Sequence, residues 1–461
     1  DATFSKYDTR IGGVIGFMYG LNVSHCTNSG NITINSGAFY YLYCGGIVAY
    51  SGSSSIVNDA HNTGAIYMKK EVTQIHSLVL GGAVGYQQND DATGTGDFNN
   101  VINDGAITIE ANMPENTDYN YFRIGGIAGW SQGENNNNTN NGAINISGSL
   151  YNAHSSAHSM CVAGIVGYKT VDAVKDVENN GDITISAPVG YAEGSDCRLY
   201  VAGITGYGVT VVSNAKNTGD IEITGATQGY LGVGGIAGWF GNQITNIENT
   251  GNIKVKVTSI NAHTYISGCI AATTASPETG YILSNFINRG SINIEADSCK
   301  GLWLGGCLGF WSKQVAIALR SAENYGPITV KTTASHTEVR IGGIIGYLYG
   351  TSNSRGLHNH KSATINVDVD VTGGALCVGG IASGLRDALD AAKSGEPANG
   401  NDADIFVTGS TKTAFEVGGG ICTPNNYNRT NITNNGNITI TGADAANYSL
   451  SLSLVSANSA N

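Results

Sequence analysis

A two-part sequence pattern recurs along almost the whole chain. Residues 233–239 read VGGIAGW, and ten residues later the chain reads NTGNIKV. With the small-residue pair as the marker, repeats begin near residues 11, 44, 80, 124, 162, 201, 233, 266, 304, 341, 378 and 417. The spacing averages about 37 residues, a period typical of repeat architectures. We therefore expect a single repeat domain over residues 1–461.

Each repeat contains short segments in which apolar residues lie two positions apart. Leu42 and Cys44 precede one glycine pair, and Ile107-Thr108-Ile109 follows an Asn-x-Gly turn. This period of two indicates strands, and Asn-Gly pairs indicate turns. The repeats leave no room for crossover helices, which predicts an all-β, right-handed parallel β-helix (β-solenoid) of about twelve coils. A β-propeller fits less well, because its blades need four strands each and usually number four to eight.

Stacking of coils predicts an asparagine ladder at one corner, because the asparagine that opens the Asn-x-Gly turn recurs in nearly every repeat. Side-chain amides stacked in this way can bond one another and the turn backbone. The glycine two residues later is expected to supply a positive φ, which glycine adopts readily. The residues predicted to have this structural role include Asn103, Asn140, Asn179, Asn217, Asn249, Asn288, Gly142 and Gly251.

Two rows of large side chains flank the glycine pairs. The aromatic after Ile-x-Gly should stack on its equivalents (Phe17, Tyr50, Tyr86, Trp130, Tyr168, Tyr207, Trp239, Phe310, Tyr347). This aromatic row either locks coil on coil or offers a ligand platform. A second row, just before the apolar-Gly-Gly, should point away from the core, and Tyr, Trp and Arg are common at interfaces. The predicted ligand-binding candidates on and beside this strip are Tyr43, Arg123, Tyr200, Tyr230, Tyr265, Trp303 and Arg340, unless loops cover them.

Two segments depart from the pattern. Residues 384–397, GLRDALDAAKSGEP, replace an Asn turn and place Leu385, Leu389 and Ala392 on one helical face. Gly395 and Pro397 would end such a helix, so we predict a short helical insertion. The chain then ends with YSLSLSLV (448–455), an alternating strand without a following glycine pair. An uncovered last strand is a pairing hazard, which suggests that a partner or a further domain covers the C-terminal coil.

Composition narrows the possible functions. The formal net charge is −12 with only 23 Lys+Arg, which argues against nucleic-acid binding. No apolar run reaches the roughly 18 residues of a membrane-spanning helix.

Nine cysteines occur without a CxxC or Cys/His spacing, and Cys44, Cys269, Cys307 and Cys377 fall in or beside apolar positions, which suits small buried thiols. Cys269 and Cys307 occupy equivalent positions in successive repeats. No motif calls for a cofactor or a metal.

One family shares these motifs. GGIAGW (residues 125–130) followed by NNNTNNGAINISG (136–148) resembles the GLUG-type repeat, and the likeness covers residues 11–440. Ile or Val usually replaces the family's Leu, and several repeats are degenerate. The resemblance implies a secreted or surface-anchored bacterial protein, such as an outer-membrane adhesin or a stalk. It implies an architecture and a location, but no activity.

An enzyme is the competing interpretation, because parallel β-helices also include polysaccharide lyases and glycoside hydrolases. Glycosidases need two carboxylates at roughly 5–9.5 Å. The candidates are the equivalent Asp182 and Asp220, with Glu178 nearby, yet Asn31, Asn252 and Asn437 occupy the same position elsewhere. Asp368/Asp370 and Asp402/Asp404 lack a calcium-loop pattern, and His358 and His360 suit an exposed loop.

The sequence thus favours a non-enzymatic β-solenoid, extracellular or on the bacterial cell surface. It would act as an adhesin, as a glycan- or protein-binding module, or as a stalk. The partner would be a glycan or a surface protein. The alternative is a carbohydrate-active enzyme.

Overall fold

The computed structural model describes most of the chain. The described residues are 8–35, 39–52, 54–71, 75–88, 96–112, 121–152, 159–186, 189–191, 198–227, 229–273, 281–297, 299–311, 317–332, 338–349, 353–371, 373–385, 389–411, 414–424, 431–441 and 449–453. The chain divides into two compact units, Asp1–Tyr230 (unit 1) and Leu231–Asn461 (unit 2).

Unit 1 contains three groups of stacked strands. Sheet 1 contains β1 (Asp8–Gly12), β5 (Ile32–Ile34), β6 (Tyr41–Gly45), β10 (Ile66–Glu71), β11 (Ser77–Gly81), β15 (Ile107–Asn112), β16 (Tyr121–Gly125), β20 (Ile144–Asn152), β21 (Ser159–Ala163), β24 (Ile183–Ser186), β25 (Val189–Tyr191), β26 (Arg198–Ala202) and β29 (Ile221–Thr227). Sheet 2 contains β2 (Ile15–Tyr19), β7 (Val48–Gly52), β12 (Val84–Gln87), β17 (Ala128–Ser131), β22 (Val166–Lys169) and β27 (Thr205–Gly208). Sheet 3 contains β3 (Asn22–Ser24), β4 (Thr27–Asn28), β8 (Ile56–Asn58), β9 (His61–Asn62), β13 (Phe98–Asn99), β14 (Ile102–Asn103), β18 (Asn135–Asn136), β19 (Thr139–Asn140), β23 (Val174–Asn179) and β28 (Val212–Asn217).

Unit 2 has the same organisation. Sheet 1 contains β30 (Tyr230–Gly234), β33 (Ile253–Ser267), β36 (Ile292–Ala296), β37 (Cys299–Gly305), β40 (Ile328–Lys331), β41 (Val339–Gly342), β44 (Ile365–Val371), β45 (Ala375–Gly379), β48 (Ile405–Thr411), β49 (Ala414–Gly418), β52 (Ile438–Thr441) and β53 (Ser449–Ser453). Sheet 2 contains β31 (Ala237–Phe240), β34 (Ile270–Thr273), β38 (Leu308–Trp311), β42 (Ile345–Leu348), β46 (Ala382–Leu385) and β50 (Ile421–Pro424). Sheet 3 contains β32 (Ile244–Asn249), β35 (Tyr281–Asn288), β39 (Ile317–Asn324), β43 (Arg355–Asn359), β47 (Gly400–Asn401) and β51 (Thr433–Asn434).

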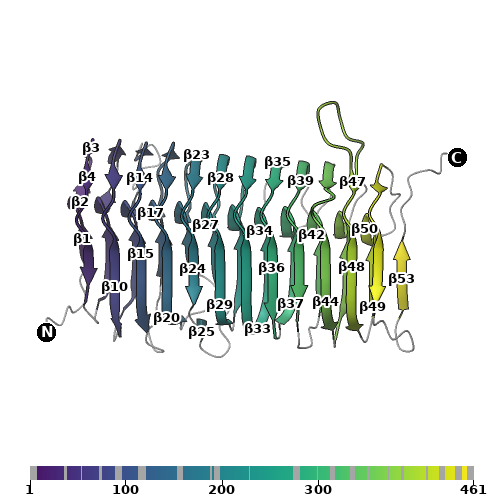
Figure 1. Ribbon diagram of the computed structural model, residues 1–461. Coiled ribbons are helices and arrows are strands. Elements are labelled where there is room, and N and C mark those ends of the chain that lie inside the picture. Colours follow the sequence, from purple (N-terminus) through teal and green to yellow (C-terminus); the bar gives the residue numbers. More distant parts are fainter. Residues whose placement is uncertain are drawn as a thin grey trace. The chain divides into compact units, whose positions relative to one another are not determined.

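Equivalent strands of successive repeats pair in parallel within each unit, so the chain is an all-β parallel β-solenoid (Figure 1). The register is set residue by residue: β6 pairs β11 with Leu42 beside Leu78 and Gly45 beside Gly81. Apolar residues two apart therefore stack on apolar residues, and strands such as β44 alternate between buried and more exposed positions. This confirms the predicted period of two and the β-helix class.

The core lies inside the coils and consists of stacked Ile, Val and Leu side chains. Ile107 and Ile144 are register partners and are fully buried, as are Ile328 and Ile365 in unit 2. Each such side chain contributes roughly 1.5–3 kcal/mol of burial free energy. Because this contact is repeated from coil to coil, each of the two units has a sizeable core although a single repeat is small.

The predicted helical insertion at 384–397 is wrong. Residues 384 and 385 belong to β46, and the described residues 389–397 contain no helix. Tertiary contacts override the local helical pattern: Leu389 is buried, the Asp390 amide donates to the Ser354 carbonyl at 2.9 Å, and Glu396 accepts from Arg355 at 2.7 Å. Gly395 makes a turn with a φ of +85° in place of a helix end.

The last strand, β53, lies within the segment that the sequence predicts to be a strand. β53 pairs in parallel with β49, with Ser449 beside Ala414 and Ser453 beside Gly418. The remaining residues of the predicted strand 448–455 lie outside the described ranges. Nothing that the structure describes tests whether this strand is covered by a partner or a further domain, and the single-domain prediction for residues 1–461 likewise stays a prediction.

Candidate functional site

The recurrent asparagines form a continuous hydrogen-bonded ladder within each unit. Asn103 donates from Nδ2 to Oδ1 of Asn140 at 2.8 Å and to the Gly105 carbonyl at 2.9 Å. The same double donation is made by Asn28, Asn62, Asn140 and Asn179 in unit 1, and by Asn249, Asn288, Asn324, Asn359 and Asn401 in unit 2. Asn217 donates to the Gly219 carbonyl. Because both amide protons are used, these buried groups are satisfied, and the ladder predicted from the sequence is confirmed as a structural element.

The glycine of the Asn-x-Gly turn is required for a different reason from the predicted one. Gly142 and Gly251 are not among the residues with positive φ. A Cβ on Gly142 would instead lie 2.2 Å from the Gly105 carbonyl oxygen, so glycine is needed for the close approach of neighbouring turns.

The left-handed conformation occurs three residues before the ladder asparagine. Asn100, Asn137 and Asp176 have φ values of 57°, 54° and 52°, and their equivalents include Asp59, Asn214, Asn246, Asn285, Ser321 and Gly356. Asn and Asp tolerate this conformation better than most residues. Asn137 also donates to Asn100 at 2.6 Å, which makes a second, exposed ladder. The sequence interpretation missed this position, although its recurrent Asn and Asp were a visible signal.

The second glycine of each Gly-Gly pair packs on the ladder asparagine of its own repeat. A Cβ on Gly82 would lie 2.4 Å from Nδ2 of Asn103, and one on Gly126 would lie 2.3 Å from Cγ of Asn140. The two halves of the repeated pattern are therefore in direct contact. This contact explains why the glycine pair and the asparagine turn recur together.

The aromatic row stacks as predicted. In unit 1 the ring centroids of Tyr86 and Trp130 are 4.6 Å apart, and those of Tyr168 and Tyr207 are 4.9 Å apart and nearly parallel. In unit 2 Phe310 and Tyr347 stack at 6.0 Å. Most rings of the row are half-buried. Other neighbours meet edge to face, as Tyr50 and Tyr86 do at 79° and Trp130 and Tyr168 at 77°, so the rings contact one another along the row without forming one uniform stack.

The strip before the glycine pairs is less exposed than predicted. Tyr200 is fully buried, and Tyr265, Trp303 and Arg123 are 5%, 6% and 2% exposed, whereas Tyr43, Tyr230 and Arg340 are half-buried. The chain bends at each glycine pair, between a strand of sheet 1 and the following strand of sheet 2, and this glycine bend turns the outer faces of the two sheets toward each other. The strip and the aromatic row therefore cover one another. Tyr265 stacks on Phe310 at 4.8 Å, and Tyr43 stacks on Tyr86 at 5.5 Å. We call the two rows together the aromatic seam.

Arg123 lies inside the seam, and no carboxylate of the described residues forms an ion pair with it. Its guanidinium carbon lies 3.7 Å from the ring centroid of Trp130 and 3.6 Å from that of Tyr168. Nε and Nη1 are buried without a hydrogen-bond partner among the described residues, and burial lowers the pKa of the guanidinium. These two cation–π contacts, and a third with Tyr121 at 4.4 Å, surround the guanidinium with aromatic rings in place of an anion. Arg340 differs, because its Nε donates to Glu338 at 2.5 Å and its guanidinium lies over Tyr347.

The two carboxylates of the enzyme interpretation have a structural role. Asp182 accepts from the backbone amide of Asp220 at 2.8 Å, and both residues are exposed. Asn252 accepts from the Ser291 amide in the same way, at 3.1 Å. Since an asparagine oxygen accepts the equivalent hydrogen bond elsewhere, this position requires a side-chain oxygen acceptor but not a carboxylate. Glu178 forms an ion pair with Lys216 at 3.4 Å.

The two histidines expected on an exposed loop belong to a half-buried polar network on sheet 3 of unit 2. His360 Nε2 lies 2.7 Å from Glu323, and His358 Nε2 lies 2.9 Å from Asp402. The ring of Tyr325 stacks on His360 at 3.8 Å, and its hydroxyl donates to Glu323. The exposed-loop expectation is therefore wrong. Tertiary pairing with acidic side chains holds both rings against the sheet.

Lys169 is fully buried, and the sequence interpretation did not single it out. Lys169 ends β22, and its Nζ donates to Ser131 Oγ at 3.3 Å and to the Gly133 carbonyl. Burial lowers the pKa of this amine to about 7, against the opposing effect of Asp172, Glu134 and Asp97. Its register partners are Ser131 and Gly208, so no repeated residue type marks the position.

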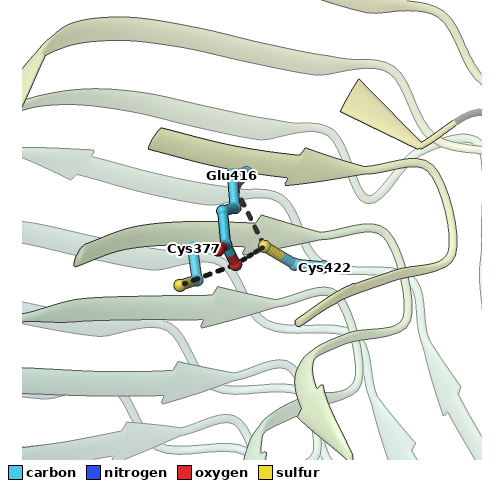
Figure 2. A group of neighbouring side chains, drawn as sticks. All are labelled: Cys377, Glu416 and Cys422. Carbon is cyan, nitrogen blue, oxygen red and sulfur yellow. Dashed lines mark hydrogen bonds between the residues drawn. The ribbon is translucent and has the colours of Figure 1, made fainter. Parts of the chain in front are cut away.

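Three potential metal ligands meet in unit 2, although the sequence predicted no metal site. Figure 2 shows Cys377, Glu416 and Cys422 with their side chains directed toward one another. One ligand atom from each residue lies within 4.8 Å of the others. Cys377 and Glu416 each stand just before an apolar-Gly-Gly (VGG at 378–380 and at 417–419), so they are consecutive members of the strip, which was a usable signal. Cys422 has no spacing motif. The structure also leaves Cys44, Cys269 and Cys307 buried and outside disulfides.

The fold and these sites define a parallel β-solenoid stabilised by an asparagine ladder and an aromatic seam. Comparison with protein-family models, curated proteins and solved structures gave no match. Across the described ranges, the chain forms no helix with the length and apolar character needed to cross a membrane.

Proposed function

We propose that this chain is a non-enzymatic β-solenoid of the GLUG-repeat type that is secreted or displayed on a bacterial cell surface. Its main role is that of a stalk or scaffold. Each repeat of about 37 residues forms one coil of a right-handed solenoid of about twelve coils.

The burial of the aromatic seam supports a stalk most directly. Tyr200, Tyr265 and Trp303 have the residue types of a binding surface, yet each is at most 6% exposed. Their ring contacts join neighbouring repeats: Tyr265 lies 5.4 Å from Trp303 and 4.8 Å from Phe310 of the next repeat. Buried aromatic pairs of this kind contribute about 0.5–1.5 kcal/mol beyond their area. The seam therefore stabilises the stack of coils.

Binding of a glycan or a protein through the rim of the seam is the second candidate. Tyr43, Tyr230 and Arg340 are half-buried and retain some exposed surface. Tyr43 contacts the rings of Tyr50 and Tyr86, so its ring is held in place. Rigid tyrosines lose little conformational entropy on binding, which suits an adhesin.

A carbohydrate-active enzyme is supported less well. Asp182 makes the same backbone contact as Asn252, and an asparagine is neither a general acid nor a nucleophile in glycoside hydrolysis.

The test combines binding and turnover. The wild-type chain is incubated with a panel of neutral and acidic polysaccharides, and new reducing ends, unsaturated products and bound protein are measured. The stalk proposal predicts no product and no saturable binding. Saturable binding that Tyr43→Ala and Tyr230→Ala weaken would favour the adhesin role. Product formation that Asp182→Asn or Asp220→Asn abolishes would establish the enzyme.

A further inference from the structure

The cluster of Cys377, Glu416 and Cys422 is built by three strands of unit 2. Cys377 on β45 and Glu416 on β49 are register partners in sheet 1. Cys422 lies on β50 of sheet 2, beyond the glycine bend at residues 418–420. Sγ of Cys377 is 3.7 Å and Sγ of Cys422 is 3.9 Å from the same oxygen, Oε2 of Glu416 (Figure 2).

These distances match the edges of a tetrahedral zinc site. Zinc–sulfur and zinc–oxygen bonds of about 2.3 and 2.1 Å at a tetrahedral angle place sulfur about 3.6 Å from oxygen and about 3.8 Å from a second sulfur. The two observed sulfur–oxygen distances, 3.7 and 3.9 Å, are close to this value. The two sulfur atoms lie within 4.8 Å of each other, and the Cys422 thiol also donates to the Glu416 backbone carbonyl at 3.0 Å. For a cation to bind between the three ligand atoms, the sulfurs must approach by at most about 1 Å and this hydrogen bond must break.

The donor set is also selective. Two thiolates and one carboxylate suit zinc and similar thiophilic divalent cations, whereas calcium and magnesium prefer oxygen ligands. Both cysteines are buried and Glu416 is half-buried, so the cluster is accessible from the glutamate side. We propose that Cys377, Glu416 and Cys422 bind one Zn²⁺, with the fourth coordination position open to solvent.

Binding exchanges protons for the cation. Burial raises the pKa of the Cys422 thiol, and the neighbouring Cys377 and Glu416 raise it further. Coordination breaks two S–H bonds, forms two sulfur–metal bonds and one oxygen–metal bond, and releases two protons to solvent. The occupied site carries one net negative charge. Arg340, which is paired with Glu338, lies on β41 as the register partner of Cys377 and adds a positive charge near the site.

The consequence for the molecule is a cross-link between sheets 1 and 2 of unit 2. The cation would join β45, β49 and β50, and it would stabilise the folded state by an amount that grows with the logarithm of its free concentration above the dissociation constant. This role goes beyond that of a passive scaffold, because the stability of unit 2 would then respond to zinc.

Calorimetric titration of the full chain with Zn²⁺, under reducing conditions, tests the site. We expect one cation per chain, two protons released per cation, tighter binding as pH rises, and a sulfur-to-metal absorption band with Co²⁺. Cys377→Ala, Cys422→Ala and Glu416→Gln should each weaken binding by more than the roughly 10–100-fold cost of losing an outer-shell partner. Glu416→Gln keeps the shape of the side chain, so it tests the site even where a cysteine variant fails to fold.

The matched control replaces the other stacked cysteine pair of the same unit. Cys269 and Cys307 are buried, and their thiols donate to the carbonyls of Ile287 and Glu323 in place of a carboxylate. The double variant Cys269→Ala, Cys307→Ala should bind Zn²⁺ as the wild type does. The proposal is overturned if folded, reduced wild-type protein binds no Zn²⁺, or if binding is equal in the wild type and in the three site variants.

Discussion

A Cβ added to Gly82 would lie 2.4 Å from Nδ2 of Asn103, so the glycine pair and the asparagine ladder of one repeat touch without room for a further atom. The same side chain of Asn103 bonds Asn140 of the next repeat at 2.8 Å. Packing within a repeat and hydrogen bonding between repeats therefore share one amide group. This shared group explains why both motifs recur together along the chain.

The first prediction tests that contact. Gly82→Ala should lower the free energy of unfolding by about 1–3 kcal/mol or more, because its Cβ would meet both Asn103 and the Gly126 carbonyl oxygen. Gly16→Ala is the control, since its nearest contact is the Arg10 carbonyl oxygen at 3.6 Å. Urea unfolding of the two variants should separate them. Equal stability would mean that Gly82 has more space than the structure gives it.

The second prediction concerns the ladder. Asn140→Ala removes the acceptor of Asn103 and the donor to Asn179, which leaves buried polar groups unsatisfied. The expected loss is about 1–3 kcal/mol for each such group. Asn141→Ala, next along the chain but exposed, should change stability by no more than about 0.5 kcal/mol. Thermal unfolding measures both, and a neutral Asn140→Ala would remove the ladder's structural role.

The third prediction uses the buried guanidinium of the seam. Arg123→Met should leave stability unchanged or raise it, because the guanidinium is buried without an anion and its Nε and Nη1 lack hydrogen-bond partners among the described residues. Arg123→Ala should lower it, since the space between Trp130 and Tyr168 would be empty. Chemical unfolding distinguishes the two. A marked destabilisation by Met would indicate that the positive charge itself is required.

The fourth prediction is a pH dependence. The pKa of Lys169 falls from 10.5 to about 7 on folding, so between these values the unfolded chain binds more protons and stability rises with pH. Below pH 7 both states are protonated, and the full cost of the buried charge, a few kcal/mol, is present. Lys169→Met should therefore stabilise the protein most at pH 6 and progressively less toward pH 10.

Unfolding at pH 6, 8 and 10 measures this effect. The control is Lys175→Met, because Lys175 is half-buried and pairs with Glu134 at 3.2 Å. The control should show no such slope. A wild type and a Lys169→Met variant with parallel pH profiles would contradict the lowered pKa.

Much of the fold could be predicted because it depends on periodic residues. The strands around Ile107 and the Asn103 ladder recur at a fixed spacing, and stacking converts spacing directly into contact. The insertion at 384–397 could not be predicted, since Leu389 and Glu396 are held by distant partners rather than by their own helical pattern.

The sites were harder to predict than the fold. The burial of Tyr200 depends on the angle of the glycine bend, which sequence alternation does not encode. Lys169 and Cys422 lack equivalents of the same type in neighbouring repeats, so no periodic signal marked them. Cys377 and Glu416 were placed in one row by the sequence, but the third ligand required the chain path after the bend.

The melting temperature of a triple variant tests the central claim, that the aromatic seam stabilises the solenoid. Tyr200→Ala, Tyr265→Ala and Trp303→Ala each leave a cavity at a buried site. Truncation of a fully buried aromatic side chain lowers the free energy of unfolding by about 3–5 kcal/mol, so the triple variant should lose at least several kcal/mol. The matched triple variant Leu21→Ala, Val171→Ala, Phe406→Ala removes side chains outside the seam that are 56%, 49% and 41% exposed. We predict a large drop in melting temperature for the first variant and little change for the second. An unchanged melting temperature in the first variant, with loss of binding to a glycan or a surface protein, would contradict the account.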